Sequence, residues 1–234
     1  MKEFEGKDLK EIFIELTAYF KPKIVLELGA REASYSCKVS ELLPEAQIYA
    51  FEANPYCYER YSKQIEAKKY PVDYLHLIIS DTVGQEDFIF LEELEGKKID
   101  PYNGGQSIKP RSTEESVTST TKVDSITGEY FLKERWYNEE SIALWVDVEG
   151  ANKEVFTGMG AYMDNVILVH CEVEKREIWE DQWLDKDTIE FCEKYNLVPI
   201  AKDNQAKRQY NVIFVKEEFL TDSTIEDIMG SYVG

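Results

Sequence analysis

The strongest constraint on the fold is a repeated pairing of a short apolar run with a segment of helical apolar spacing. Three such runs come early in the chain, at Lys23–Leu28, Gln47–Phe51 and Tyr74–Ile79. Helical segments separate them, at about Tyr35–Leu43 and Pro55–Ala67. Short apolar runs bounded by turn residues are typical of buried strands, and strands that alternate with helices pair in parallel through right-handed crossovers. The pattern predicts an α/β fold built on a mostly parallel sheet.

The middle of the chain interrupts this alternation. Asp87–Leu91 and Val117–Thr121 have the composition of strands and flank a loop rich in Gly, Lys and Pro at Glu95–Arg111. We expect an antiparallel excursion here, which forms a β-rich insertion before the fourth strand of the sheet. A helix is predicted at about Asp124–Glu134, after which the strands resume.

Apolar runs in the last third of the chain complete the predicted sheet. Strands are expected at Ile142–Val146 and Val166–Glu172, and a helix is expected at about Lys186–Tyr195. The two final runs, Val198–Ala201 and Tyr210–Val215, could form a hairpin at the edge of the sheet.

The chain shows no linker, internal repeat or low-complexity segment, and its 234 residues suit one domain. We expect an N-terminal helix within residues 1–22, a Rossmann-like core at 23–216 and a C-terminal tail at 217–234. Apolar residues spaced for one helix face, from Leu9 to Tyr19, support the opening helix.

Composition argues against several classes of function. A formal net charge of −19 opposes the binding of a phosphate backbone, so a nucleic-acid partner is not expected. No apolar run reaches the roughly 20 residues of a membrane span, and the charged N-terminus does not resemble a signal peptide. The 4 cysteines form no CxxC pair, which argues against zinc and redox sites. The predicted location is the cytoplasm.

Acidic residues close five of the predicted strands, namely Glu27, Glu52, Asp81, Asp147 and Glu172. Ligands of open parallel sheets bind beyond the carboxyl ends of the strands. A carboxylate in that crowded place is costly unless it binds something. The row of acids therefore indicates a ligand that carries hydroxyls, amines or positive charge.

The first two acids belong to a pattern typical of nucleoside sites. Gly29 allows close approach of the backbone at the first turn, and Glu52, about 20 residues later, can accept hydrogen bonds from both ribose hydroxyls. This geometry suits NAD and S-adenosylmethionine alike. Only the first glycine of the GxGxxG dinucleotide fingerprint is present, and Glu32 would repel a diphosphate. Glu27 suits a cationic amino-acid group, which favours S-adenosylmethionine and leaves an NAD-dependent oxidoreductase as the alternative enzyme.

A series of motifs resembles those of the FkbM-type methyltransferases. In order they are Leu26–Ala30 with Tyr35–Ser36, Ala50–Pro55, Ser80–Asp81 with Gly84 and Phe88, Asn103–Ile108, Thr121–Ile126, Val146–Ala151 with Glu154–Phe156 and Gly158, and Asn211–Val215. The most specific is Asp147-Val148-Glu149-Gly150, which is similar to the Ile-Asp-Val-Glu-Gly signature of the family. Arg31 and Ala33 depart from the family pattern, which usually has Asn and Gly there. Trp145 replaces the usual lysine before the signature.

The resemblance implies a class I methyltransferase fold, in which a mostly parallel, seven-stranded, Rossmann-like sheet ends in an antiparallel strand. It also implies methyl transfer from S-adenosylmethionine to oxygen, on a hydroxyl of a sugar or other glycan, a polyketide or another small molecule. The non-enzymatic alternative is a methyltransferase fold that has lost catalysis and serves as a binding or scaffold protein. The acceptor, the oligomeric state and the role of Trp145 stay open at this point.

The same resemblance predicts the cofactor site. Its expected members are Glu27, Gly29, Ala30, Arg31, Glu52, Ala53, Ser80, Asp81, Ser107 and Asp147. We assign Glu27 and Gly29 to the methionine part and Glu52 to the ribose. Asp81 is expected near the adenine edge, and Ser107 is expected to close the pocket from its loop.

Asp147, Glu149 and Glu172 are the candidate catalytic residues. Asp147 is the first candidate for general base or acceptor anchor, because the fourth strand ends beside the sulfonium in this fold. The three acids could also hold a hard divalent cation through oxygen ligands, although a metal is not predicted. For Glu149 the alternative role is capping of the next helix. His76 and His170 are expected to be structural.

Overall fold

The computed structural model describes residues 1–112, 115–135, 137, 140–204 and 206–232. Its main sheet has eight strands in the order β1-β11-β12-β10-β9-β2-β3-β4. Their bounds are β1 (Lys2–Phe4), β2 (Ile24–Leu28), β3 (Gln47–Phe51), β4 (Asp73–Leu75), β9 (Ile142–Val146), β10 (Val166–Glu174), β11 (Leu197–Asp203) and β12 (Gln209–Lys216).

The order of the strands confirms the class I methyltransferase topology that the motifs implied. Parallel pairing joins β4, β3, β2, β9 and β10, whereas β12 runs antiparallel to both β10 and β11. The sheet has one strand beyond the expected seven, because Lys2–Phe4 pairs in parallel with β11. The last two runs pair with each other as β11 and β12, as predicted. They do not form the edge of the sheet, because β1 pairs with the outer side of β11.

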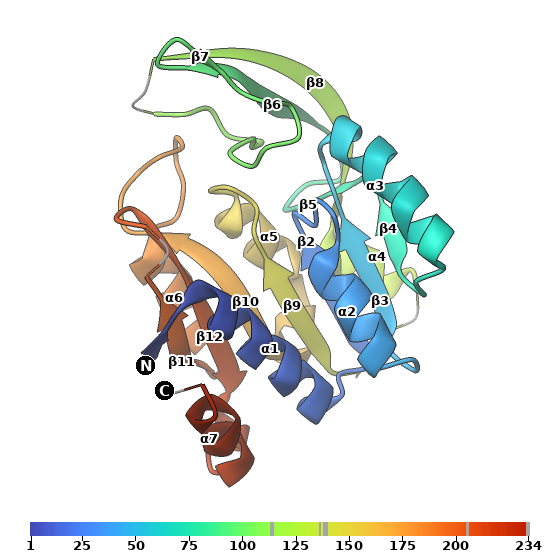
Figure 1. Cartoon of the computed structure of the whole chain (residues 1–234), viewed down its shortest axis with the longest axis vertical. Coiled ribbons are helices and arrows are strands. Elements are labelled where there is room, and N and C mark those ends of the chain that lie inside the picture. The colour runs from blue at the N-terminus through green and yellow to red at the C-terminus, as the bar shows by residue number, and fades with distance from the viewer. Residues whose placement is uncertain (113–114, 136, 138–139, 205, 233–234) are drawn as a thin grey trace.

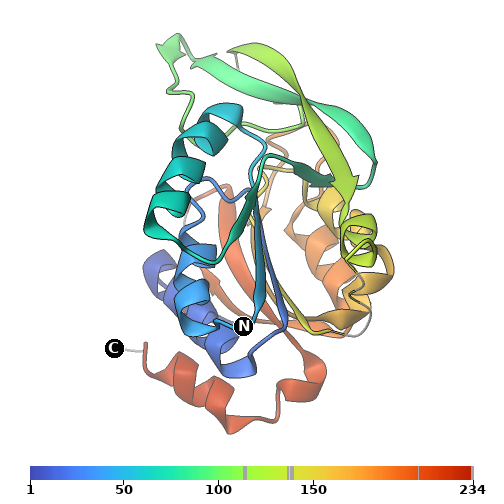
Figure 2. The same ribbon diagram turned by 90° about the vertical axis from the view of Figure 1, so that its right-hand side faces the viewer.

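Helices cover both faces of the main sheet, as Figures 1 and 2 show. On one face lie α1 (Gly6–Phe20), α2 (Ser34–Leu42) and α3 (Pro55–Lys68). On the other lie α4 (Gly128–Lys133), α5 (Asn152–Gly158) and α6 (Asp185–Glu193). Short 3-10 helices span Gly160–Asn165 and Glu217–Phe219, and the last helix, α7 (Ser223–Gly230), packs against α1.

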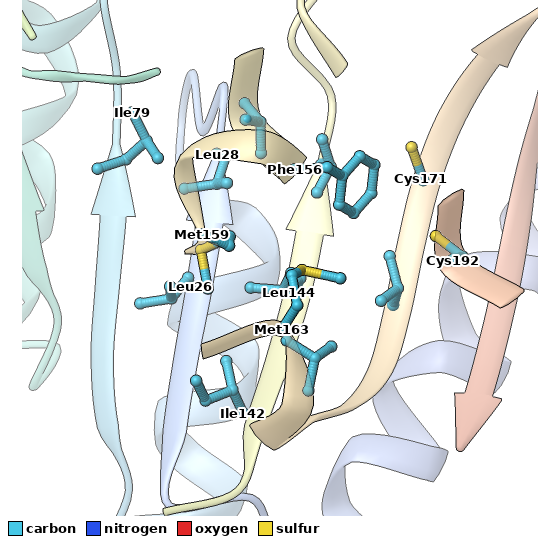
Figure 3. Packing of buried hydrophobic residues seen from close by; sticks show 14 of the residues in the cluster. Leu26, Leu28, Ile79, Ile142, Leu144, Phe156, Met159, Met163, Cys171 and Cys192 are labelled. Carbon is cyan, nitrogen blue, oxygen red and sulfur yellow. The ribbon is translucent and has the colours of Figure 1, made fainter. Parts of the chain in front are cut away.

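Burial on both faces explains why the strands are apolar almost throughout rather than alternating. Val25 belongs to the core beneath α1 and α2. Leu26 and Leu28 of the same strand point to the opposite core, to which Phe156 of α5 and the nearby Met159 also belong (Figure 3). All four cysteines are buried free thiols, in keeping with the absence of a CxxC pair.

A second sheet stands beyond the carboxyl edge of the main one, with the order β5-β8-β6-β7 (Figure 1). Its strands are β5 (Ile78–Ser80), β6 (Gly84–Leu94), β7 (Lys97–Lys98) and β8 (Ser116–Thr127). β6 pairs antiparallel with β7 and β8, which confirms the predicted β-rich insertion. Within the segment that connects β7 and β8, residues 113–114 lie outside the described part of the chain.

The prediction of a single strand at Tyr74–Ile79 is wrong. β4 pairs with β3 in the main sheet, whereas β5 pairs with β8 in the second sheet. The main-chain N–H of Glu52 donates to the carbonyl of Leu75, the last residue of β4. The chain leaves the main sheet after this residue. Because the apolar run continues through the change of sheet, its composition could not reveal the break.

The helix predicted from Asp124 begins later, at Gly128. β8 continues through Asp124 because its pairing with β6 extends to Ser125. The side chain of Thr127 then accepts a hydrogen bond from the N–H of Tyr130 and caps α4. The Thr-rich composition of the run favoured a strand, but the pairing that lengthens it comes from a strand distant in sequence.

Among the described helices, none is long and apolar enough to cross a membrane. The division into segments 1–22, 23–216 and 217–234 stays a prediction. The first segment contains β1 as well as the expected helix, and the third contains α7; residues 233–234 of that segment lie outside the described part.

Glu27 connects strand β2 to the helix that follows it. Its side chain is buried on the α1 and α2 face, and Oε2 accepts the main-chain N–H of Ser36 in the first turn of α2 at 2.9 Å. Burial raises the pKa of Glu27 to about 7, although the hydrogen bonds with Ser36 and the charge of Lys10 oppose the rise. The folded chain therefore favours the protonated form more than the unfolded chain does.

This shift predicts a pH-dependent part of the stability. Below a pH of about 4.5 Glu27 is protonated in both states, and as the pH rises to about 7 only the unfolded state releases its proton freely. The free energy of unfolding should fall over that window by up to about 3 kcal/mol through this residue. Urea unfolding at several pH values should show a smaller fall for Glu27→Gln than for the wild type. Equal slopes for the two proteins would contradict the assignment.

Close packing at Gly158 joins α5 to the second sheet. A Cβ at this position would lie 1.9 Å from the main-chain oxygen of Ser80 at the end of β5. Gly158→Ala should therefore destabilise the protein by about 1–3 kcal/mol, since overpacking outweighs the better helix propensity of alanine. Thermal unfolding should show a fall in Tm of a few degrees.

Gly230→Ala is the matched control for Gly158→Ala. Gly230 also lies in a helix, but apart from its chain neighbours and the backbone of its own helix no described atom lies within 4 Å of the position a Cβ would take. The exchange should leave Tm unchanged or raise it slightly, by less than about 1 kcal/mol of stability. A loss at Gly230 as large as at Gly158 would show that packing against Ser80 is not the cause.

Candidate functional site

A cavity opens beyond the carboxyl ends of β2, β3 and β9, under the segment that carries Asn103 to Ile108. The predicted site residues on its wall are Gly29, Arg31, Glu52, Ala53, Ser107, Asp147 and Glu149. Five others do not line it, namely Glu27, Ala30, Ser80, Asp81 and Glu172. The sequence therefore located the edge of the sheet correctly, but several acids at that edge point elsewhere.

Glu52 is held rigidly at the end of β3. Its side chain is only 6% exposed, and its two carboxylate oxygens accept the N–H groups of Arg31 at 2.5 Å and Asn54 at 2.6 Å. Burial raises its pKa to about 7 against these two hydrogen bonds, and the nearby charge of Asp147 adds to the rise. A carboxylate oxygen can accept a second hydrogen bond, so the group can still receive two donors from the cavity.

Arg31 and Ala33, which depart from the family pattern, lie in the turn after β2 and have unusual backbone conformations. Both residues have positive φ angles, 46° and 52°, in the left-handed region. Glycine and asparagine adopt this conformation at lower cost than other residues. At Arg31 the turn is secured on both sides, because its N–H donates to Glu52 and its carbonyl accepts the hydroxyl of Tyr74. The chain thus adopts the left-handed conformation at both positions without glycine or asparagine.

Gly29 is required by its neighbouring strand. Its φ is 77°, and a Cβ would lie 1.8 Å from the carbonyl oxygen of Asp147 at the end of β9. The N–H of Asp147 in turn donates to the carbonyl of Leu28 at 3.0 Å. The predicted approach of a ligand to Gly29 stays a prediction, and the close contact of two main chains is a second reason for glycine here.

The loop that follows β7 in the second sheet closes the cavity through hydrogen bonds to residues at the edge of the main sheet. The side-chain amide of Asn54 donates to the carbonyl of Pro101 at 2.7 Å and to Oε1 of Gln106 at 2.5 Å. The hydroxyl of Ser107 donates to the carbonyl of Glu149 at 2.6 Å. Sequence reasoning included Ser107 but missed Asn54 and Gln106. Asn54 carried a signal, because an Asn before a Pro is typical of a helix start.

The half of the cavity beside the second sheet is apolar. Ile78 and Ile79 of β5, Phe88 of β6 and Ile108 of the loop line it. A flat aromatic base fits such a wall, and a carboxylate does not. Asp81, which was expected near the adenine edge, is exposed just beyond β5. Ser80 is fully buried, and its main chain packs against Gly158 of α5 rather than facing the cavity.

Three acids gather at the ends of β9 and β10. Carboxylate oxygens of Asp147, Glu149 and Glu172 all lie within 4.8 Å of one another. Desolvation raises the pKa of each, and the negative charge of Asp147 raises the pKa of Glu149 and Glu172 further. Glu174, the next inward-facing acid of β10, is 1% exposed and has a raised pKa for the same reasons. The structure thus brings together the three predicted catalytic residues.

Glu149 does not cap the following helix. The helix α5 begins at Asn152 without a side-chain cap, and Oε1 of Glu149 instead accepts the N–H of Gly105 at 3.0 Å. Glu149 itself has a φ of 50°, which is costly for a residue with a side chain. This backbone conformation and the bond from Gly105 direct the carboxylate towards the cavity.

Trp145 and His170 lie in a buried aromatic cluster and not in the cavity. Their rings stack at 3.7 Å between centroids, and Phe13 of α1 and Tyr35 of α2 pack against them. Burial lowers the pKa of His170 to about 3, so the ring is neutral and cannot serve as a base near neutral pH. The tryptophan in place of the family's lysine therefore packs the sheet against α1 and α2.

Comparison with known proteins agrees with this geometry. The sequence profile of the methyltransferase FkbM domain matches residues 18–198. The 2-O-methyltransferase NoeI of Sinorhizobium fredii is 25% identical over 192 residues, which make up 75% of this chain and 73% of NoeI.

Solved structures with a similar fold include two that were determined with S-adenosylhomocysteine. The N-terminal domain of EvdMO1, with D-fucose also present, has a TM-score of 0.48 and 10% identity, covering 91% of this chain and 83% of its own. TrmK of M. capricolum has a TM-score of 0.45 and 9% identity, covering 91% of this chain and 73% of its own.

The profile match covers most of the chain and includes the strand-end acids, the turn at Gly29 and the Asp-Val-Glu-Gly sequence. It favours a methyltransferase over the NAD-dependent alternative. The chain belongs to the FkbM methyltransferase family, and S-adenosylmethionine is its methyl donor.

Proposed function

We propose that this enzyme transfers the methyl group to a hydroxyl oxygen of a small molecule, with a sugar or other glycan as the first class of acceptor to test. The observation that carries the proposal is the acid cluster at the ends of β9 and β10, beside the turn that contains Gly29. A hydroxyl is a weak nucleophile and needs a group that takes its proton. The relative NoeI is named a 2-O-methyltransferase, which supports the choice of oxygen.

The cavity offers separate places for the parts of S-adenosylmethionine. Glu52 accepts the two ribose hydroxyls with the lone pairs that its main-chain partners leave free. The apolar wall at Ile78 and Phe88 receives the adenine. The methionine end lies over Gly29 and towards Asp147, whose negative charge complements the sulfonium. Glu27, enclosed beneath α2, supports the turn and makes no contact with the donor.

The acceptor hydroxyl lies between the methyl group and Asp147 in this proposal. The hydroxyl oxygen attacks the methyl carbon in line with the carbon–sulfur bond, which breaks with its electron pair passing to sulfur. The hydroxyl proton passes to the carboxylate of Asp147. Its raised pKa makes this carboxylate a stronger base than an exposed aspartate.

Other expectations from the sequence stay predictions. They are the single domain, the cytoplasmic location, and a partner that is a small molecule or glycan rather than a nucleic acid. The net charge of −19 supports the last of these, because a polyanion would be repelled at long range.

Glu52→Gln tests the cofactor site. The amide loses one of its two main-chain hydrogen bonds and the charge that strengthens the ribose contacts, so binding of S-adenosylhomocysteine should weaken by about 2 kcal/mol, or roughly thirtyfold. Isothermal titration calorimetry measures this directly. Glu59→Gln on the exposed face of α3 is the matched control and should bind like the wild type. An unchanged affinity in folded Glu52→Gln would refute the ribose assignment.

Asp147→Asn tests the base. Turnover should fall by about 10²–10⁴-fold, whereas the affinity for S-adenosylhomocysteine should stay close to that of the wild type. Release of S-adenosylhomocysteine with a panel of mono- and oligosaccharides measures turnover. Asp73→Asn, at an exposed position of β4, controls for the loss of one negative charge. Full activity of Asp147→Asn would remove Asp147 from the reaction.

A further inference from the structure

The acid cluster differs from the other strand-end acids because one of its members, Asp147, has neither a hydrogen-bond donor nor a salt-bridge partner among the described residues. Glu27 and Glu52 each accept main-chain N–H groups. Asp147, in contrast, accepts no hydrogen bond from the described residues, and none of their cationic side chains lies within salt-bridge distance of the cluster. Three carboxylates this close repel one another strongly in a partly desolvated place. Such a group persists in folded proteins when something positive binds between its members.

Glu172 gives an independent indication of what binds there. The residue is 5% exposed, and its Oε1 is buried without a hydrogen-bond partner among the residues that the structure describes. Its other oxygen, Oε2, accepts the side-chain amide of Gln209 at 2.9 Å, which fixes the orientation of the carboxylate. A buried carboxylate oxygen that lacks a donor is costly unless it has a ligand.

Glu149 is arranged in the same way. One oxygen accepts the N–H of Gly105 at 3.0 Å, and no described residue donates to the other. Carboxylates that bind a metal usually accept a hydrogen bond on one oxygen from a neighbouring group, which orients the other oxygen towards the metal. Gln209 and Gly105 thus hold two of the three acids in place.

From this geometry we propose that Asp147, Glu149 and Glu172 bind a divalent cation of the Mg²⁺ or Mn²⁺ class. Oxygens at most 4.8 Å apart lie no more than about 2.8 Å from a common centre, and Mg²⁺ binds oxygen at about 2.0–2.1 Å. Side-chain shifts of less than about 1 Å therefore bring all three into contact. Mg²⁺ keeps several waters when bound by few carboxylates, which leaves positions for an acceptor oxygen.

The sulfonium of the methyl donor is the rival partner for these charges. It can reach Asp147 and Glu149, which line the cavity, but Glu172 does not line it. The S-adenosylmethionine sulfonium carries three carbon substituents and is too bulky to reach the buried Oε1 of Glu172, whereas a single metal ion is small enough. The cluster also offers three carboxylate groups, more than one sulfonium needs.

The role of the cation in catalysis rests on the proposed function, whereas its binding does not. A hydroxyl oxygen bound to a divalent cation is more acidic, so its proton passes more readily to the free oxygen of Asp147 and then to water. The carbon–sulfur bond breaks as before, with its electron pair passing to sulfur.

The test is a titration of Mn²⁺ into the chelator-treated chain of 234 residues, without methyl donor. The EPR signal of free Mn²⁺ measures how much of the ion is bound. We expect one ion per chain, competition by Mg²⁺, and a rise in Tm with Mn²⁺. Glu172→Gln and Asp147→Asn should weaken binding by at least about tenfold. Glu174→Gln is the matched control, since this equally buried acid lies outside the cluster, and it should stay within about threefold of the wild type.

The Tm of each metal-free variant shows whether it folds. We expect this Tm to equal or exceed that of the metal-free wild type, because an amide of equal size replaces a buried carboxylate that neighbouring carboxylates repel. A loss of binding would then not result from a failure to fold. Absence of Mn²⁺ binding up to millimolar concentrations, or unchanged binding in Glu172→Gln, would overturn the proposal. The sulfonium would be the partner of Glu172 if Glu172→Gln bound Mn²⁺ like the wild type, lost affinity for S-adenosylmethionine and kept affinity for the uncharged S-adenosylhomocysteine. That result would also overturn the proposal.

Titration of S-adenosylhomocysteine into the same metal-free protein separates the two proposals. If S-adenosylhomocysteine binds and Mn²⁺ does not, the cation site is wrong, and the donor site on which O-methyl transfer depends stands. If Mn²⁺ binds and S-adenosylhomocysteine does not, the cation site stands and the proposed function is wrong.

Discussion

The site depends on the contact between the end of β2 and the end of β9. Gly29 approaches the carbonyl of Asp147 so closely that a Cβ would lie 1.8 Å away, and the N–H of Asp147 donates to the carbonyl of Leu28. This contact joins the part of the cavity wall that contains Glu52 to the part that contains Asp147 and Glu149. A side chain at position 29 would separate the two strands, and with them the two parts of the cavity wall.

Once the strand ends are fixed, the same class of residue takes different roles according to its partners. Glu27 is enclosed beneath α2 and accepts an N–H of that helix, so it stabilises the turn. Glu52 is held by two main-chain donors and keeps lone pairs for the cavity. Glu172 has a buried oxygen to which no residue in the described part of the chain donates, which makes it the member of the row most in need of a ligand. Burial and hydrogen-bond supply, and not the residue type, separate these roles.

The sequence predicted the main sheet well, because each central strand is buried on both faces and forms an uninterrupted apolar run. It failed where pairing between distant segments decided the outcome. The run through Tyr74–Ile79 divides between two sheets, and β8 extends past Asp124 because β6 lies beside it. The short strand β1 had no signal, since three residues with two exposed side chains show no periodicity.

What the sequence determined by itself is the order of the strands, the family and the position of the acids at one edge, because each rests on local pattern or motif. Only the tertiary structure decided which acids face the cavity. Asp81 extends into solvent, Glu27 turns beneath a helix, and Glu172 lies against Asp147 and Glu149. The direction of a side chain at a strand end depends on the helix or loop packed over it, and those elements come from distant parts of the chain.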